Sequence, residues 1–167
     1  MKQQRGFTLI ELVVVIVILG LLAATALPKF IDVTTDAREA SVQGVAGGLR
    51  AAAALGQAQY VVNGNKSATS ISMGGTTVTV LCEDTSGSCA NGGAGMGGRP
   101  TADANGIVVA MPNPDGFDNP TSHSDSSAGA GTANYLVYEP TSGGNASCRA
   151  TYTPANSDPV SVAIGGC

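Results

Sequence analysis

Hydrophobic residues dominate the start of this chain, and Glu11 is the only charged residue between Phe7 and Leu27. This apolar run has 21 residues, so as an α-helix it would be about 30 Å long, close to the thickness of the hydrocarbon core of a membrane. An ionised carboxylate near the end of a membrane-spanning segment is costly, and it therefore needs a partner or a function. The pattern predicts a membrane-spanning helix that carries one functional acid.

After Leu27 the pattern becomes amphipathic, with apolar residues three or four positions apart and polar residues between them. The apolar set is Phe30, Val33, Ala37, Ala40, Val45, Leu49, Ala52, Ala53 and Tyr60. We expect the helix to continue, with one side covered by a globular domain. Pro28 removes one main-chain hydrogen bond between the two parts, and Gly20 lies two turns earlier, so a kink or frayed segment is expected there. The alternative is that a membrane helix ends at Pro28 and a second helix begins.

Glycine and alanine crowd residues 44–58 of this helix, including Gly44, Gly47, Gly48 and Gly56. Each glycine costs a helix up to about 1 kcal/mol relative to alanine, so the run needs tertiary support. We expect a sheet to pack closely against these positions. A helix break at Gly47 and Gly48 is the alternative.

Past Asn63 the chain changes to short runs rich in β-branched and aromatic residues, bounded by turn-forming residues. The predicted strands are residues 76–81, 107–111, 135–139, 147–153 and 160–164. Because no long helical pattern separates them, we expect an α+β fold in which a small antiparallel sheet packs on the long N-terminal helix. Two stretches rich in Gly, Ser and Ala, residues 85–98 and 121–132, are predicted to be surface loops.

Composition and charge agree with one small globular domain after the helix. The 167 residues carry a net charge of −4, and removal of Lys2 and Arg5 with a leader would make the rest more acidic. Nucleic acid is not expected as a partner, because phosphate binding needs clustered Lys and Arg.

The segment from Gly6 to Leu12, Gly-Phe-Thr-Leu-Ile-Glu-Leu, follows a short basic leader. It resembles the signal of type IV prepilins, the precursors of type IV pilus subunits. The resemblance implies that a prepilin peptidase cuts after Gly6 and methylates Phe7, and that Glu11 pairs with the amino terminus of a neighbouring subunit during assembly. Cleavage would place the new amine one helical turn from Glu11. The resemblance also implies that the stretch from Gly20 to Pro28 loses helicity in the assembled filament.

The same resemblance implies a type IV pilin fold and four segments. These are a leader peptide (1–6), a transmembrane and polymerisation helix (7–28), its amphipathic half (29–62) and a β-rich head (63–167). The expected function is a structural subunit that polymerises with itself into a surface filament for adhesion. It would wait in the inner membrane, where the pilus assembly machinery extracts it, before becoming part of the extracellular pilus. From Pro28 to about Asn65 the chain is also similar to the major pilins of mannose-sensitive haemagglutinin (MSHA) pili.

Several alternatives stay open from the residues. The start of the chain could be an ordinary secretory signal cut after Ala26, or an uncleaved membrane anchor. The filament subunit could instead be a pseudopilin of a type II secretion system, a minor pilin or a tip adhesin.

The four cysteines fit disulfide bonds in an oxidising compartment. Three pairings are possible. We favour Cys82 with Cys89 and Cys148 with Cys167, because each pair joins nearest neighbours and closes a loop that contains turn residues. The second pair also resembles the disulfide that closes the carboxy-terminal region of type IV pilins. A four-thiolate zinc site is the less favoured alternative, since no Cys-x-x-Cys spacing is present.

No catalytic residue, cofactor or metal site is predicted, so we do not expect an enzyme. His123 lies near Ser122 and Asp125 in sequence, which does not make a catalytic triad. Asp115, Asp118 and Asp125 could offer oxygen ligands to calcium, but they lack the spacing of a dedicated calcium loop. Asn65 and Asn145 lie in Asn-x-Ser sequences that are too common to support a claim of glycosylation.

Overall fold

The structure is a computed structural model that describes residues 7–83, 96–125 and 133–167. The chain divides into two compact units, Met1–Ala37 and Arg38–Cys167. The long helix α1, Leu9–Asn63, contributes residues to both units. The expected α+β arrangement of a long N-terminal helix followed by a small antiparallel sheet is confirmed.

The N-terminal part of α1 is the segment that can cross a membrane. Among the described residues, one stretch, Leu9–Ala26, is long and apolar enough, with a mean hydropathy of 2.8 and none of it buried. Helical structure continues through Gly20 and Pro28, so the alternative of a separate second helix after Pro28 is not supported. The helix ends where Gly64 adopts the left-handed conformation, with φ at 68°. The Gly64 N–H there donates to the carbonyls of Tyr60 and Val61.

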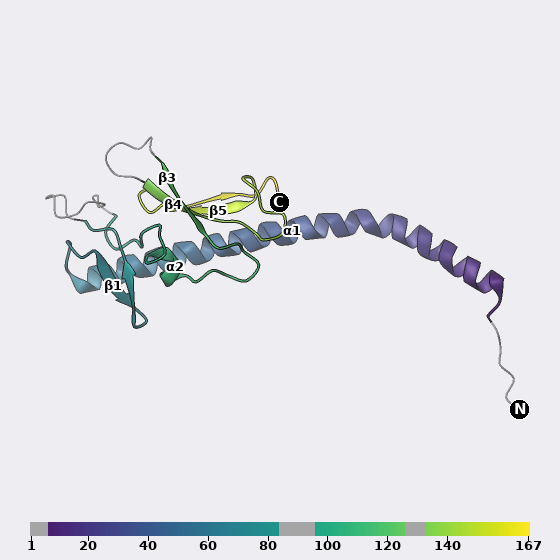
Figure 1. The fold of residues 1–167 in the computed structure, drawn as a ribbon, viewed down its shortest axis with the longest axis horizontal. Helices are drawn as coiled ribbons and strands as arrows, with labels where there is room; N and C mark the ends of the chain where they lie inside the picture. Colours follow the sequence, from purple (N-terminus) through teal and green to yellow (C-terminus); the bar gives the residue numbers. More distant parts are fainter. Residues whose placement is uncertain (1–6, 84–95, 126–132) are drawn as a thin grey trace, which may run out of the picture. The chain divides into compact units, whose positions relative to one another are not determined.

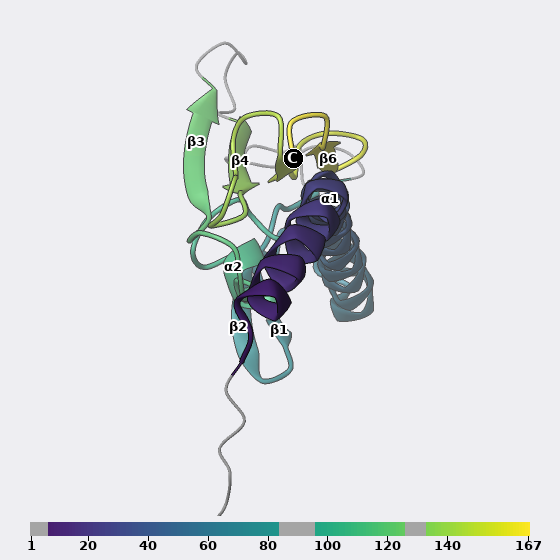
Figure 2. The same ribbon diagram turned by 90° about the vertical axis from the view of Figure 1, so that its right-hand side faces the viewer.

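In the described part of the head there are two antiparallel sheets (Figure 1). The strands β1 (Ser70–Met73) and β2 (Thr76–Thr79) form a hairpin. The second sheet has the order β3 (Thr121–Asp125), β4 (Ala133–Tyr138), β5 (Arg149–Tyr152) and β6 (Val160–Ala163). In its register Leu136 faces Tyr152, and Tyr152 faces Val160. Figure 2 shows β3 at one edge of this sheet and β6 nearer to α1.

The larger core lies between the sheet and one face of α1. Its buried members come from α1, from the turn region around Ile107 and from three strands: Val42, Val45, Ala46, Leu49, Ala52, Ala53, Ala102, Ile107, Leu136, Tyr138, Cys148, Ala150, Tyr152 and Val160. A smaller core joins Tyr60 of α1 to the hairpin through Ile71, Val78 and Val80. The predicted packing of a small sheet on the amphipathic half of the helix is therefore confirmed.

The covered face of α1 begins later than the apolar pattern suggested. Val33 is 58% exposed, and Ala37 and Ala40 are exposed as well. Coverage starts at Val42, which is fully buried. The apolar pattern starts at residue 30, whereas the first helix residue in the core is Val42.

The prediction of a strand at residues 107–111 is wrong. Residues Ile107–Ala110 form α2, a single helical turn. A turn places them: the Asn105 N–H donates to Asp103 Oδ1, and the Gly106 N–H donates to the Asp103 carbonyl. Ile107 then fills the core, which a short apolar run can do as a helix or as a strand.

The prediction that residues 121–132 form a loop is also wrong in its first part. Thr121–Asp125 is the edge strand β3, which pairs with β4 from Thr121↔Val137 to Asp125↔Ala133. Main-chain pairing needs no apolar side chains, and edge strands are commonly polar. Residues 126–132, and most of the loop predicted at 85–98, lie outside the described residues.

The sequence analysis does not predict the hairpin strand β1. Its turn is formed by Gly74 and Gly75, whose φ angles are 58° and 86°. Two consecutive positive φ values are typical of the two-residue hairpin turn that glycine favours.

The small residues of α1 divide between two faces. A Cβ atom on Gly56 would lie 2.6 Å from the Gly98 carbonyl oxygen and 3.0 Å from Pro100 Cδ, and one on Gly48 would lie 2.8 Å from Met111 Sδ. These two glycines allow close packing, as predicted, but the neighbours are residues 98–100 and Met111 rather than strands of a sheet. The helix α1 does not break at Gly47 and Gly48. Gly44 and Gly47 have nothing within 4 Å of such a Cβ, so they face open space.

This division predicts opposite effects for two Gly→Ala substitutions. Gly47→Ala should raise the free energy of unfolding by about 0.5–1 kcal/mol, because alanine favours the helix and meets no neighbour. Gly56→Ala should lower it by about 1–3 kcal/mol, because the new methyl group overlaps backbone that cannot move aside cheaply. Denaturant unfolding of the full chain in detergent would measure both. A loss of stability in Gly47→Ala would contradict the open face.

Two tyrosines fill the centre of the larger core. Tyr138 and Tyr152 are both fully buried. The Tyr152 hydroxyl donates to the Pro100 carbonyl at 2.8 Å, whereas within the described residues the Tyr138 hydroxyl has no hydrogen-bond partner. Burial raises the pKa of Tyr138 to about 12. Burial also raises the pKa of Tyr152, and the charge of Arg99 opposes that rise.

These pKa shifts predict that the head loses stability at alkaline pH. A buried tyrosine stays protonated in the folded state, while in the unfolded chain it ionises near pH 10. Stability should therefore be full below about pH 10 and fall progressively as the pH rises towards 12. Denaturant unfolding at a series of pH values, with tyrosinate absorbance recorded in parallel, would measure the loss.

Two phenylalanine variants separate the contributions of Tyr138 and Tyr152 to the stability of the head. Tyr138→Phe should make the alkaline loss shallower and cost little at neutral pH, because it removes an unpaired hydroxyl. Tyr152→Phe should cost about 1 kcal/mol at neutral pH, because it leaves the Pro100 carbonyl without its donor. An alkaline loss in Tyr138→Phe as steep as in the original chain would argue against this origin.

Candidate functional site

The first turn of α1 holds the acid that the sequence analysis singled out. Glu11 Oε2 accepts hydrogen bonds from the Thr8 main-chain N–H at 3.0 Å and from Thr8 Oγ1 at 2.8 Å. In return, the Glu11 N–H donates to Thr8 Oγ1 at 3.3 Å. This reciprocal arrangement is a capping box, which satisfies main-chain donors at the start of a helix. Glu11 therefore has a structural role inside its own chain.

Thr8 was missed in the sequence analysis, although its signal was present. A Thr followed three residues later by Glu, just before an apolar run, is typical of a capping box. Phe7 precedes this turn and is 84% exposed. The other half of the predicted cleavage site, Gly6, lies outside the described residues.

The remaining sites predicted in the helix lie within α1 itself. A Cβ atom on Gly20 would have nothing within 4 Å, so this face of the helix is open. Pro28 lies inside α1. A kink at these two residues stays a prediction.

Of the predicted disulfides, the pair Cys148–Cys167 is present, with the two Cα atoms 4.7 Å apart. It closes a loop of 19 positions, and on the loop-entropy account such a bond contributes about 3 kcal/mol. Cys148 is fully buried and belongs to the larger core. Cys82 is 2% exposed, but its predicted partner Cys89 lies outside the described residues, so that pairing stays a prediction.

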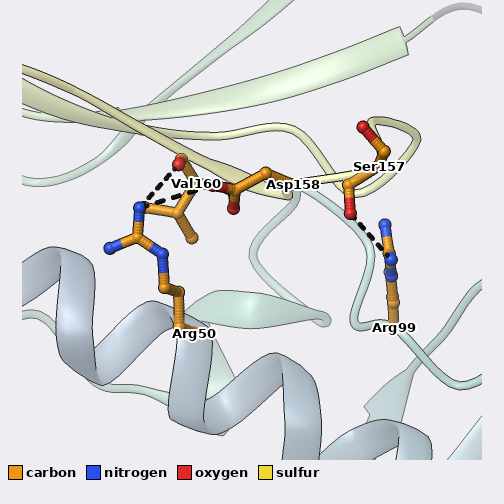
Figure 3. Close-up of polar contacts among 5 residues, drawn as sticks. All are labelled: Arg50, Arg99, Ser157, Asp158 and Val160. Carbon is orange, nitrogen blue, oxygen red and sulfur yellow. Dashed lines mark hydrogen bonds and ion pairs between the residues drawn. The ribbon is translucent and has the colours of Figure 1, made fainter.

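Two arginines of α1 bind the disulfide loop. Arg38 Nη1 donates to the Cys167 carbonyl at 3.3 Å, and Arg50 Nη2 donates to the Val160 carbonyl at 3.0 Å. Figure 3 shows Arg50 extending from α1 towards Val160 and Asp158. Arg50 Nη2 also lies 3.6 Å from Asp158 Oδ2. The pKa of Asp158 is lowered, chiefly by the Val160 N–H that donates to it and also by Arg50.

Arg99 binds the turn between β5 and β6. Its guanidinium donates to the carbonyls of Pro154, at 3.1 Å, and Asn156. Its Nη2 donates to the Ser157 carbonyl at 3.3 Å, the contact that Figure 3 shows. Five donors in a rigid fork suit arginine to such a cluster of carbonyls. The three arginines therefore fix the disulfide loop in place, and no sequence pattern marks contacts of this kind.

No group of three or more His, Cys, Asp or Glu side chains that could hold a metal was found among the described residues. Asp115 and Asp118 are exposed, and the main chains of His123 and Asp125 pair within the sheet. Asn145 is engaged locally: its Nδ2 donates to the Gly166 carbonyl, and its Oδ1 accepts from the Ser147 N–H.

Exposed apolar side chains concentrate on the helix. In the part of the chain that the structure describes, every exposed large hydrophobic residue except Val162 lies between Phe7 and Val62. The stretch from Leu9 to Leu22 is exposed around the whole helix, and Leu55, Val61 and Val62 continue the apolar surface near its end. Exposed apolar surface of this extent marks a place where lipid or protein binds.

Comparisons with known proteins agree with this N-terminal region. The prokaryotic N-terminal methylation motif matches residues 1–27. The type IV narrow pilus major component PilA5 of Thermus thermophilus is 49% identical over 55 residues, which cover 33% of this chain and 47% of that protein. The type IV major alpha-pilin of Moraxella bovis is 43% identical over 72 residues, or 42% of this chain and 45% of that protein.

A further relative, the type IV major pilin protein PilE1 of Neisseria gonorrhoeae, is 60% identical over 35 residues and covers 21% of each chain. The chain thus spans about half the length of the first two relatives, and less of the third. No solved structure matches this chain. The methylation motif and the pilin relatives together support the type IV pilin family for this chain, through its N-terminal region, and its α+β architecture is consistent with the type IV pilin fold.

Proposed function

We propose that this chain is a structural subunit of a type IV pilus, which polymerises through α1 into a filament at the cell surface. The observation that carries the proposal is the apolar surface of Leu9–Ala26, none of which is buried by the chain itself. Its N-terminal end carries the methylation motif and the acid Glu11. A helix of this kind needs lipid around it before assembly and neighbouring helices afterwards.

The first step in this proposal is removal of the leader. A prepilin peptidase cuts after Gly6 and methylates the new terminus at Phe7. Before cleavage, the basic leader keeps the N-terminal end of the segment in the cytoplasm. After cleavage, segment 7–28 anchors the subunit in the inner membrane. The head, residues 63–167, lies on the outer side with its disulfide, which is the compartment where disulfides persist.

Assembly is the second step, in which the pilus machinery moves the subunit from lipid into the filament. Apolar side chains exchange lipid for neighbouring helices, so burial changes little and specific contacts must set the register. Glu11 supplies such a contact by pairing with the Phe7 amine of a neighbour. Its Oε2 already caps its own helix, and among the described residues Oε1 accepts no hydrogen bond.

Two features of α1 fit a helix that must repack. Pro28 lacks the N–H that would bond to the Ala24 carbonyl, so one hydrogen bond fewer is broken if the stretch from Gly20 to Pro28 loses helicity. Gly44 and Gly47 face open space on the side of the helix away from the core. A neighbouring helix can approach closely where side chains are absent.

Pilus function is favoured over the alternative of a pseudopilin in a type II secretion system, because the relatives carry the names of pilus and fimbrial proteins. Those relatives are structural proteins, and we propose the same non-enzymatic role here. Use of the filament for adhesion, and the finer similarity to MSHA major pilins between Pro28 and Asn65, remain part of the proposal.

A test of Glu11 must separate its charge from its role in the capping box. Glu11→Gln removes the charge but keeps a side-chain oxygen that can accept the hydrogen bonds of a capping box. Glu11→Ala removes both. We expect both variants to insert and to lose the leader, and both to reduce filament yield at least about tenfold, because the neighbour's amine then has no counter-charge. Electron microscopy and quantification of sheared filaments would measure the yield.

Thr8→Val is the matched control, since it weakens the capping box and keeps the carboxylate. Mass spectrometry of each purified chain should give Phe7 as the first residue. Normal filament yield in Glu11→Gln would refute the charge pairing, whereas an intact leader or a start elsewhere would refute the cleavage site.

A further inference from the structure

A shallow hollow lies on α1 where the apolar stretch ends. It has a volume of about 270 Å³ and is lined by Thr25, Ala26, Lys29 and Val33. These residues share one face, because positions three and four apart are neighbours on a helix. The Thr25 hydroxyl donates to the Leu22 carbonyl at 3.0 Å, so it is turned to its own helix. The hollow is therefore lined mainly by apolar surface, and Lys29 is the one cationic residue among those that line it.

The position of this hollow along the helix matches the edge of a membrane. Leu9–Ala26 is the membrane-spanning candidate, and Lys29 follows Ala26 by three residues, or about 4.5 Å along the axis. The polar headgroup layer of a bilayer is about 5–7 Å thick on each side. A lysine at this point buries its methylene stem against apolar surface and extends its ammonium to the level of the lipid phosphates.

We propose that the hollow binds a phospholipid of the outer leaflet, with its phosphate on the Lys29 ammonium and the upper part of its acyl chains over Thr25, Ala26 and Val33. The inference rests on the membrane stage of the proposed function. The volume of about 270 Å³ is below the roughly 300–1,000 Å³ of pockets that enclose a small molecule. It suits one part of a lipid that stays in the bilayer.

Charge favours a lipid over a second copy of this chain as the occupant. Lys29 is the only basic residue of the sequence between Phe7 and Ala37. An apolar helix in the hollow would bring no counter-charge of its own while it removed the ammonium from water, which is costly. A phosphate supplies that counter-charge. The contact would fix the depth of the subunit in the membrane until it is extracted.

Solid-state NMR of the full chain in phosphatidylglycerol bilayers tests the contact. The chain has three lysines, Lys2, Lys29 and Lys66, so a Lys2→Gln/Lys66→Gln variant has Lys29 as its only lysine. With isotope-labelled lysine side chains, the lipid phosphorus should dephase the Lys29 ammonium signal strongly. The matched control, Lys2→Gln/Lys29→Gln, reports on Lys66 of the head, and its dephasing should be at least about twofold weaker.

A third variant tests the hollow itself. Adding Ala26→Leu to the first variant fills the hollow and keeps the ammonium, and we expect the dephasing to fall at least about twofold.

Equal, weak dephasing of Lys29 and Lys66 would overturn the phosphate contact, and so would pairing of Lys29 with Asp32 detected in its place. Unchanged dephasing with Ala26→Leu would show that the hollow is not the lipid-binding site, and cross-linking of Lys29 to a second copy would show the same. These measurements need no assembly machinery, so their failure is distinct from failure of the filament, which the Glu11 variants report.

Discussion

Packing of one face of α1 against the β4, β5 and β6 strands is the interaction on which the rest of the head depends. Leu49 and Ala46 of the helix and Tyr138 and Tyr152 of the sheet lie at its centre. The core contains few large side chains, and it leaves the opposite face of α1 uncovered. Because a helix cannot turn both faces to one sheet, the same packing that folds the head also presents the other face, with Gly44 and Gly47, to the outside.

So thin a core leaves the turns of the disulfide loop dependent on other contacts. Buried or partly buried carbonyl groups need donors wherever the strands end. The Cys148–Cys167 bond restrains the two ends of the loop. Between those ends, Arg50 binds the carbonyl of Val160, and Arg99 binds carbonyls near Ser157. An exposed ion pair such as Arg50–Asp158 contributes little. The hydrogen bonds to the carbonyls fix the geometry.

The sequence predicts those elements whose signal is long or repeated. The apolar run before Leu27, the amphipathic turns after Val42 and the strands at β2, β4, β5 and β6 follow from periodicity and residue type. Residues 107–110 were assigned wrongly, because four apolar residues do not distinguish a helical turn from a strand and the decisive contact of Ile107 is tertiary. The polar edge strand β3 carries no side-chain pattern at all.

Some local signals were readable and were missed. The Gly74-Gly75 pair between two short β-rich runs indicates a hairpin and would have located β1. Thr8 and Glu11 have the spacing of a capping box. Contacts between arginine and main-chain carbonyls are different in kind, since they join residues more than 50 positions apart and depend only on the final fold.

The capping box changes the interpretation of the acid at the start of α1. A helix that begins in lipid has unsatisfied N–H groups at its first turn, and no water is there to satisfy them. Glu11 with Thr8 satisfies such groups within the chain, so the carboxylate is useful before any neighbour is present. The charge that makes it costly in a membrane is the property that a neighbour's amine would use. Acceptor and charge are thus separable properties of one side chain: the capping box uses the first, and the proposed filament would use the second.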